Sequence, residues 1–289
     1  MEDNFLLPPP PPGPDPLLTL SNVSLSFDPA STPPLSAINL TVRPGMRLLL
    51  HGPIASGKST LLHGLAGRLL PLSGTRTTGR WVQMLLWDQT AREGLGAEEE
   101  SPLQFVQRGG SVDESAALET LLSLGLDPWA ARRPCCCLSS GERTLVALAS
   151  IALIPRHLLL LDNPTVFLGA AAARRLVEAL APERWSGALV VSSSSRAFCE
   201  ALHPTHVAQL CNGTIHLLER PPCAADWPDE SVDNDWVNDD ERLVAVPAST
   251  EGKPPPDNDA DNTMTAGASD VKRQLVDAEA DPVHAVPAE

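Results

Sequence analysis

The sequence lacks several features that define common protein classes. It has no tyrosine, and aromatic residues make up 4% of the chain, so we expect no extensive aromatic recognition surface. It has no apolar run of the about 18 residues that a membrane span needs. The best candidate, residues 151–161, is interrupted at Pro155, Arg156 and His157. The opening Met1-Glu2-Asp3 also lacks the basic character of a signal peptide, so we expect no secretory leader.

The six cysteines form no familiar framework. Cys135, Cys136 and Cys137 are consecutive, which is the spacing neither of a disulfide-stapled domain nor of a zinc site. We interpret them as small apolar residues before a loop, and metal or redox use as the alternative. With the missing leader, they predict a cytoplasmic protein.

Positive charge is scarce where negative charge is abundant. Residues 1–220 hold 17 Lys or Arg and 19 Asp or Glu, whereas residues 221–289 hold 4 and 17. The formal charge of −15 therefore lies almost wholly in the last quarter. A near-neutral body without basic clusters gives no sign of a nucleic-acid surface, and we expect no direct DNA binding.

Composition also predicts where the folded part begins and ends. Residues 8–16 are all Pro, Gly or Asp, which forbids helix and sheet, so residues 1–16 are predicted to be a disordered, extended arm. Residues 221–289, rich in Asp, Asn, Pro and Ala, bury too little apolar surface to offset their chain entropy and are predicted to be a disordered acidic tail. Residues 17–220 remain as one domain.

Within that domain, short apolar stretches alternate with helical ones, which predicts an α/β fold with a mostly parallel sheet. Strands are expected at 18–27, 37–42, 47–51, 81–87, 158–161, 188–192, 206–211 and 214–218. Helices are expected at 58–69, 141–154, 170–180 and 196–202, with a small helical insertion over 93–134.

The most specific motif runs from Gly52 through Gly57 and Lys58 to Ser59 and Thr60 and matches G-x-x-x-x-G-K-[ST]. It follows an apolar strand and opens a helix, as a phosphate-binding loop requires. Backbone N–H groups and the helix N-terminus would face a diphosphate, Lys58 would add a point charge, and Ser59 would offer a hydroxyl to Mg²⁺.

A carboxylate completes this chemistry. Asp162 follows four apolar residues, 158–161, and is predicted to hold the Mg²⁺ shell at the end of a buried strand. An aspartate in that position alone would more often be a turn or cap residue, but beside the loop motif the metal role is favoured.

A third motif lies between these two, because Leu138-Ser139-Ser140-Gly141-Glu142 opens the helix that precedes Asp162. With Gln89, the ordered motifs resemble the ATP-binding cassette of the ABC superfamily. The resemblance covers about residues 17–219 and is closest to a single, degenerate cassette of the ABC-F group. The stretches that carry it are 101–107, 140–143 with 146–149, and 159–165.

The resemblance implies a P-loop NTPase domain of ABC type, with a mixed sheet and a small helical subdomain, that binds ATP and Mg²⁺. It implies that Phe27 stacks on adenine, although an ordinary apolar strand residue is the alternative. It implies that Gln89 senses Mg²⁺ and the γ phosphate, with a solvated loop residue as the alternative. Ser139 and Gly141 would contact the γ phosphate bound by a second cassette, so a single cassette needs a partner.

The departures from the family pattern concern the attacking water. Asn163 stands where the family has a catalytic Glu, and an amide has no protonation equilibrium near pH 7 that would make it a general base. Ser193 replaces the switch His, and Gly169 replaces the Asp that helps to align the water. We therefore expect Mg²⁺-ATP binding with slow or partner-dependent hydrolysis.

Three functions stay open at this stage. The ABC-F resemblance implies work on the ribosome or translation, although this chain has one cassette and no charged linker. A cassette could instead be the ATP-binding subunit of a membrane transporter. It could also be a non-catalytic scaffold whose tails bind partners.

Overall fold

Six strands form the central sheet of the computed structural model, which describes residues 5–28, 34–88, 90, 99–108, 112–166 and 168–227. Their order is β5-β6-β7-β3-β8-β9. The strands are β3 (Arg47–His51), β5 (Met84–Trp87), β6 (Leu158–Asp162), β7 (Ala188–Ser192), β8 (His206–Cys211) and β9 (Thr214–Leu218). The first five pair in parallel and β9 pairs antiparallel with β8. The predicted mixed, mostly parallel α/β fold is confirmed.

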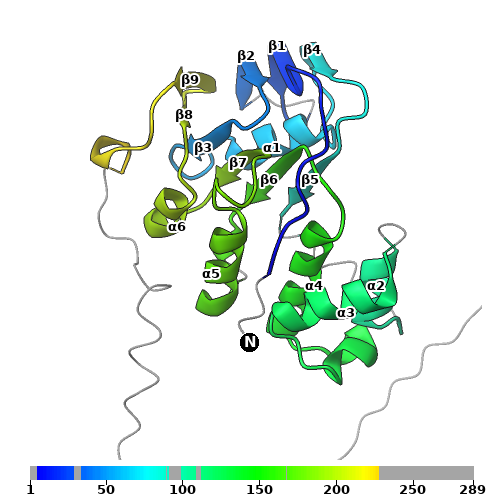
Figure 1. The fold of residues 1–289 in the computed structure, drawn as a ribbon. Coiled ribbons are helices and arrows are strands. Elements are labelled where there is room, and N and C mark those ends of the chain that lie inside the picture. The colour runs from blue at the N-terminus through cyan, green and yellow to red at the C-terminus, as the bar shows by residue number, and fades with distance from the viewer. Residues whose placement is uncertain are drawn as a thin grey trace, which may run out of the picture. The chain divides into compact units, whose positions relative to one another are not determined.

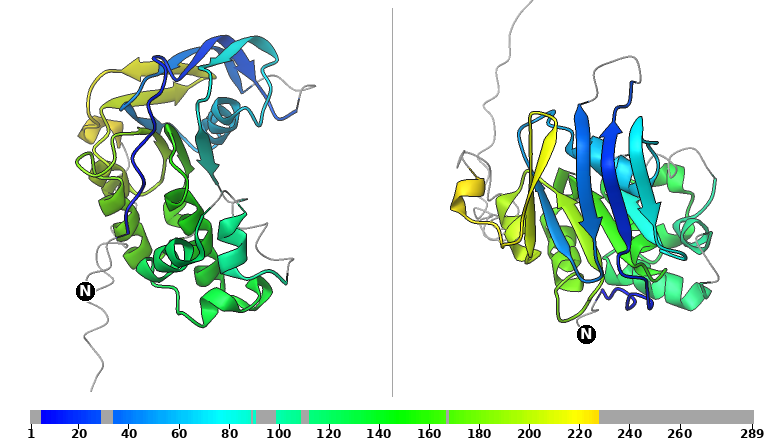
Figure 2. Two further views of the ribbon diagram at one scale, coloured as in Figure 1. Left: turned by 45° about the vertical axis from the view of Figure 1, so that its right-hand side comes forward. Right: turned by 90° about the horizontal axis from the view of Figure 1, so that it is seen from above.

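A second, antiparallel sheet covers one face of the first (Figures 1 and 2). It has the order β2-β1-β4, with β1 at Leu18–Leu25, β2 at Leu35–Val42 and β4 at Ser73–Thr78. Helix α1 (Lys58–Ala66) lies between the two sheets.

Helices cover the other face. Helices α4 (Ser140–Ala152), α5 (Ala170–Ala179) and α6 (Arg196–Ala201) pack below the central sheet in Figure 1. The predicted helical insertion is present as α2 (Pro102–Gln107) and α3 (Glu114–Ser123), which contact each other and α4. None of the helices among the described residues has the length and apolarity that crossing a membrane requires.

The central strands β3, β6 and β7 are apolar between their ends because both of their faces are buried. In β3, Leu48 and Leu50 join the core shared with α1 and the antiparallel sheet, whereas Leu49 joins the core on the helical face. Strand β6 divides in the same way, with Leu158 and Leu160 on the first side and Leu159 on the second. These two cores fix the carboxyl ends of the strands, where the functional motifs begin.

Strand β4 was not predicted from the sequence. Its residues, Ser73–Thr78, are Ser, Gly, Thr and Arg, and they carry no apolar alternation. They form a strand because they pair antiparallel with β1, leaving most of their side chains at the surface. Other expectations differ at their ends, since β1 stops at Leu25, β2 begins at Leu35, α1 ends at Ala66 and β5 begins only at Met84. Trp81 instead lies in a turn at a φ of 66°.

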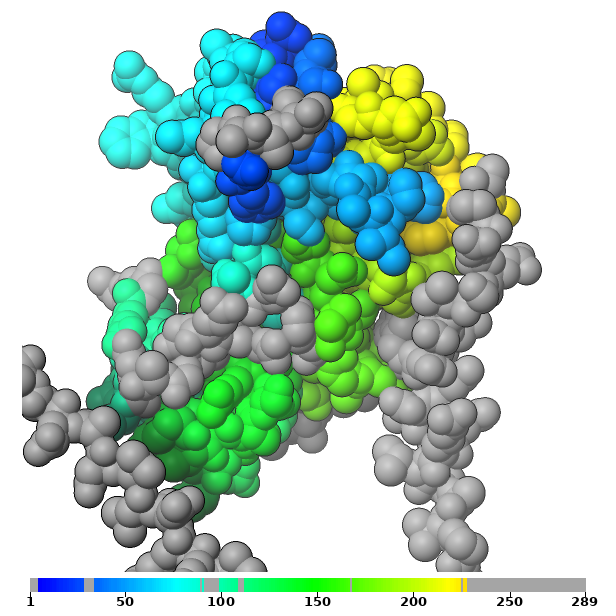
Figure 3. Space-filling view, turned by 180° about the vertical axis from the view of Figure 1, so that it is seen from behind, coloured from blue at the N-terminus to red at the C-terminus, as the bar shows by residue number. Residues whose placement is uncertain are grey.

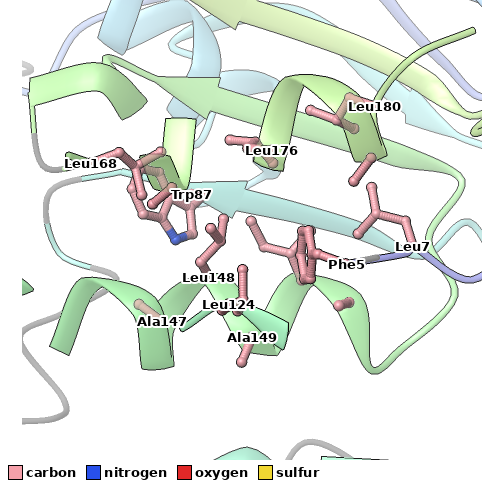
Figure 4. Close-up of a cluster of buried hydrophobic side chains, with 14 of the residues drawn as sticks. Phe5, Leu7, Trp87, Leu124, Ala147, Leu148, Ala149, Leu168, Leu176 and Leu180 are labelled. Carbon is pink, nitrogen blue, oxygen red and sulfur yellow. The ribbon is translucent and has the colours of Figure 1, made fainter. Parts of the chain in front are cut away.

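The proline-rich arm has neither helix nor strand over residues 5–16, as its composition predicts, and it bends at residues 15 and 16. It differs from the expected free linker in that Phe5 and Leu7 are 3% and 8% exposed. Figure 4 shows both side chains between the helix of Leu148 and the helix of Leu176 and Leu180, with Leu7 on the side of Leu180. Two large apolar groups before the proline run give the arm enough buried surface to order it.

The chain divides into two compact units, and all described residues belong to the first, residues 1–245. The predicted disorder of the tail concerns residues 228–289, which lie outside the described residues. The proposed division at residues 16 and 220 stays a prediction.

Candidate functional site

The phosphate-binding loop connects β3 to α1 and depends on two glycines. Gly52 has a φ of 153°, and a Cβ there would stand 2.5 Å from the carbonyl oxygen of Leu210. Gly57 caps α1 at a φ of 96°, and a Cβ there would meet Leu35 at 2.9 Å. Both positions therefore exclude a side chain, which keeps the backbone N–H groups of the loop accessible. On the face shown in Figure 3, the light-blue segment around this loop reaches the surface.

Lys58 folds back over this loop. Its Nζ donates hydrogen bonds to the carbonyl oxygens of Gly52 at 2.7 Å and Pro53 at 2.8 Å, and lies 3.5 Å from the Ser56 hydroxyl. Partial burial lowers the pKa of Lys58, and the charge of Asp162 acts against that shift. The loop thus holds a partly desolvated ammonium group above the first turn of α1, where an anionic ligand gains most from it.

Ser59 and Asp162 come together across the end of the sheet. Ser59 is the second residue of α1 and Asp162 is the last of β6, and hydrogen bonding by the Ser59 hydroxyl acts to lower the pKa of Asp162. Burial raises the pKa of Asp162, while that hydrogen bond and the charges of His63 and Lys58 oppose the increase. A hydroxyl and a carboxylate side by side are oxygen ligands of the kind that Mg²⁺ takes. Thr60 follows, buried at 7% exposure.

A second carboxylate in this region was missed in the sequence analysis. Asp88 directly follows β5, which pairs with β6, so it lies beside Asp162 at the same edge. Its side chain is 3% exposed and lies 3.0 Å from Arg68 and 3.3 Å from His63 Nε2. Thr90 donates to it through its N–H at 2.9 Å and its hydroxyl at 2.6 Å. The signal that could have found Asp88 is its place after an apolar strand, as for Asp162.

Phe27 lies 60% exposed at the mouth of this region. Its ring meets His63 edge-on, with the centroids 5.3 Å apart and the planes at 73°. One face of an exposed ring beside the phosphate-loop helix is available to a planar group. Gln89, which the resemblance placed near the metal, lies outside the described residues.

Ser139 and Gly141 lie at the start of α4. Ser139 caps the helix through a reciprocal pair, because its hydroxyl accepts from the Glu142 N–H at 3.2 Å and Glu142 Oε2 accepts from the Ser139 N–H at 2.7 Å. Arg133 forms an ion pair with Glu142, with 2.8 Å between Nη2 and Oε1. No atom of the described residues lies within 4 Å of a Cβ built at Gly141, so this helix end is open to an approaching molecule.

Asn163 and Ser193, two of the positions where the family resemblance implies water-activating groups, each form hydrogen bonds with neutral partners. Asn163 has a φ of 47°, and its Oδ1 accepts from the Ser194 N–H at 3.2 Å. Ser193 lies 2.9 Å from the Thr165 hydroxyl, oxygen to oxygen. Gly169 caps α5 in an extended conformation at a φ of −66°, where its backbone does not require a glycine. Asn163 and Ser193 thus lie on two neighbouring loops, which follow β6 and β7.

The segment after residue 220 also reaches the site. Asp226 is 1% exposed and accepts from Arg220 at 2.7 and 2.9 Å, from Gln209 at 2.9 Å and from the Cys223 N–H at 2.7 Å, which together hold its pKa far below the ordinary value. Trp227 then meets His51 edge-on, 5.3 Å between centroids. His51 directly precedes Gly52, so residues 221–227, predicted as tail, pack behind the phosphate loop.

Comparison with known proteins follows the same motifs. The family model described as ABC transporter matches residues 35–166. The chain is 32% identical over 211 residues to ABC transporter F family member 4 of Arabidopsis thaliana, covering 70% of this chain and 29% of that protein. It is 30% identical to the zinc import ATP-binding protein ZnuC of Pseudomonas entomophila, covering 76% of this chain and 81% of that protein.

Solved structures agree on the fold. The dimeric bacterial ABC transporter cassette MJ0796 matches with a TM-score of 0.57 at 19% identity, over 70% of this chain and 98% of that one. The same cassette was solved as a dimer bound to ADP and Pi, and matches with a TM-score of 0.55 at 21% identity, over the same shares. The chain spans less than a third of the length of the F family relative.

Proposed function

This chain belongs to the ABC transporter family of ATP-binding cassettes, with F family members among its relatives, and we propose that it binds Mg²⁺-ATP and hydrolyses it slowly. The observation that carries the proposal is the junction of Ser59 and Asp162 beside the ammonium group of Lys58. The loop with its hydroxyl and the carboxylate come from two distant parts of the sequence, residues 52–60 and Asp162, and meet at the carboxyl ends of the central strands.

The residues present fit a nucleotide with its metal ion. Gly52 and Gly57 keep the loop backbone free to donate to phosphate oxygens, and Lys58 exchanges its carbonyl partners for phosphate. Ser59 and Asp162 would hold Mg²⁺, which neutralises phosphate charge when bound. Phe27 would stack on the adenine ring. Gln89 remains part of this proposal on the family resemblance.

Slow hydrolysis follows from the groups around the expected water. Asn163 cannot take its proton, Ser193 carries no charge toward the phosphate, and Gly169 offers no side chain. General-base catalysis contributes typically 10²–10⁴-fold to a rate, and orientation of the nucleophile is still needed for phosphoryl transfer. The binding groups are complete, while the groups that activate water are substituted.

A second cassette, another copy of this chain or a different one, is the proposed partner. Ser139 and the open position at Gly141 would face the nucleotide of that partner, and the structural relatives are dimers. The F family relative favours a translation-linked role in the cytoplasm, and the zinc import relative favours docking to a membrane subunit. Cosedimentation of the tagged chain with ribosomes or with membranes distinguishes these two, and association with neither favours the scaffold.

The experiment that tests the core proposal is nucleotide binding and turnover on the purified full chain. We expect Mg²⁺-dependent ATP binding that weakens about 100-fold in Lys58→Ala, which is about 2.7 kcal/mol. Arg80→Ala, which removes the same charge at an exposed turn position, should bind like the wild type. Equal binding by wild type and Lys58→Ala would remove the proposal.

A further inference from the structure

The three consecutive cysteines differ sharply in their surroundings. Cys135 is 1% exposed and belongs to the core on the helical face, whereas Cys136 and Cys137 are both exposed. The sulfur atoms of Cys136 and Cys137 lie 3.8 Å apart. The apolar interpretation from the sequence therefore fits Cys135 but leaves a pair of adjacent surface thiols unexplained.

The turn that carries this pair is held on both sides. The Cys135 N–H donates to the Glu100 carbonyl at 2.8 Å, and the Cys137 N–H donates to the Pro134 carbonyl at 2.9 Å. The Cys136 carbonyl accepts from Arg143 at 3.1 Å. Backbone hydrogen bonds thus present the two side chains together, so a ligand that needs both sulfurs loses little chain entropy on binding.

The sulfur separation indicates what kind of centre would fit. A disulfide bond requires about 2.05 Å, so the pair is far from that bond. A soft pyramidal centre with bonds of about 2.3 Å to both sulfurs and angles of about 100° needs them about 3.5 Å apart, which a small side-chain rotation reaches from 3.8 Å. The described residues hold no group of three His, Cys, Asp or Glu side chains that could bind a metal ion. The fitting centre is therefore one that two thiolates satisfy.

We propose that Cys136 and Cys137 form a dithiol site that binds a soft thiophilic centre through both sulfurs, the chemical class being trivalent arsenic with one organic substituent. The reaction of an arsenoxide breaks two S–H bonds, forms two As–S bonds and releases the oxygen with both protons as one water molecule. Arsenic keeps its oxidation state, so the step needs no oxidant or reductant.

The hydrogen bond between the two thiols holds a proton that a bridging centre has to displace. The Arg143 charge favours the thiolate at Cys136, whereas the hydrogen bond to Cys137 raises the pKa of Cys136 by retaining a proton between the sulfurs. A bridging centre takes the place of that proton. The first sulfur to bind brings the second within reach, which makes capture by the pair much tighter than by one thiol.

A bound arsenical would lie next to the motif of residues 138–142 that opens α4. Cys137 is two residues before Ser139, and the Leu138 N–H closes the cysteine turn by donating to the Cys135 carbonyl at 3.2 Å. This consequence rests on the proposed function, because Ser139 and Gly141 would meet the second cassette. A bulky substituent on the bridge would then hinder nucleotide-dependent dimer formation.

The test uses the reduced full chain and phenylarsine oxide as the probe. Intact-mass measurement should find one arsenical per wild-type chain, stable to excess monothiol and released by a dithiol. Cys136→Ser and Cys137→Ser should each weaken uptake about 100-fold or more, while Cys211→Ser and Cys223→Ser, which change single exposed thiols, should leave it unchanged.

Uptake that survives in both Cys136→Ser and Cys137→Ser would overturn the site. So would the absence of stable uptake by the wild type, provided that its melting temperature matches that of the variants and so shows it to be folded. The regulatory consequence has its own readout, dimerisation with ATP before and after probe addition, with Cys137→Ser as the insensitive control. Failure of ATP binding would remove the proposed function and leave the mass result standing.

Discussion

The last residue of β6 and the residue after it make the most informative comparison in this molecule. Asp162 interacts with charged and ionisable groups, since His63, Asp88 and Lys58 all influence its pKa through their charges. Asn163, one position later, has hydrogen bonds with the neutral groups of Ser192, Ser194 and Val166. The proposed binding side of the site thus contains charged groups, whereas the side proposed to face the attacking water contains amide and hydroxyl groups.

This difference teaches that the two tasks are separable in the fold. The left-handed φ of 47° at Asn163 turns consecutive side chains in different directions, so substitution at one position need not disturb the other. A change on the neutral side should alter turnover without altering affinity, and a change on the charged side should do the reverse.

The largest expected effect is a gain of turnover in Asn163→Glu. A carboxylate at this position can accept the proton of an attacking water, and general-base contributions start at about 100-fold, so we expect about a 100-fold increase in the ATPase rate. We expect the lower end of the range for general-base catalysis because Ser193 and Gly169 still replace two other groups that would orient the water. The measurement is phosphate release at saturating Mg²⁺-ATP.

Asn163→Gln is the matched control, since it adds the same length without a charge, and its rate should equal that of the wild type. Affinity for a non-hydrolysable ATP analogue should change little in either variant. An equal rate in Asn163→Glu and Asn163→Gln would contradict the separation of the two sides.

The converse change is Asp162→Asn, for which we expect about a 30-fold loss of Mg²⁺-dependent ATP affinity, about 2 kcal/mol, because a charged metal ligand is removed. Without nucleotide the variant should melt at or above the wild-type temperature, since burial makes the ionised carboxyl costly in the folded state. Isothermal titration and thermal melting check both. Asp88→Asn, at the neighbouring strand end, should instead lower the melting temperature by unpairing Arg68.

The same carboxyl predicts a pH dependence. Because the pKa of Asp162 is raised above the ordinary value of about 3.9, the group takes up a proton at a higher pH than an exposed aspartate. Mg²⁺ affinity should fall as the pH falls through that raised pKa, while the folded state without ligand gains stability over the same window. A pH profile of affinity that is unchanged in Asp162→Asn would show that another group is responsible.

Sequence reasoning found those parts of the site that depend on local sequence. The positions of the glycines predict the conformation of the loop from Gly52 to Thr60, and the apolar run before Asp162 predicts that it ends a buried strand. Sheet class followed from apolar runs that are buried on both faces. These features require no knowledge of which strands are neighbours.

The missed features all depend on long-range pairing. Strand β4 forms because β1 offers it a partner, and the sequence of β4 alone contains no apolar pattern. Asp88 reaches Asp162 only because β5 lies next to β6. Phe5 is buried because α4 and α5 leave room for it, which a proline-rich composition conceals.

A smaller effect is expected at the open helix end. Gly141→Leu adds a side chain where no described atom lies nearby, so the monomer should fold and bind ATP as before. If a second cassette approaches there, overpacking should weaken dimer formation about 10-fold, about 1.4 kcal/mol. Light scattering with and without the ATP analogue measures this, and Glu119→Leu, on the exposed side of α3, is the control. Unchanged dimerisation in Gly141→Leu would mean that the second cassette does not contact this helix end.

The smallest effect separates base recognition from phosphate recognition. Phe27 is 60% exposed and contacts the site only through the edge of His63, so its removal leaves the charged groups in place. Stacking is worth about 1 kcal/mol, and Phe27→Ala should therefore weaken ATP binding about 5-fold while binding of inorganic tripolyphosphate stays constant. Phe27→Trp should restore ATP binding. Equal losses for ATP and tripolyphosphate would mean that Phe27 supports His63 and the phosphate loop instead, and the charged side of the site would then extend to the aromatic ring.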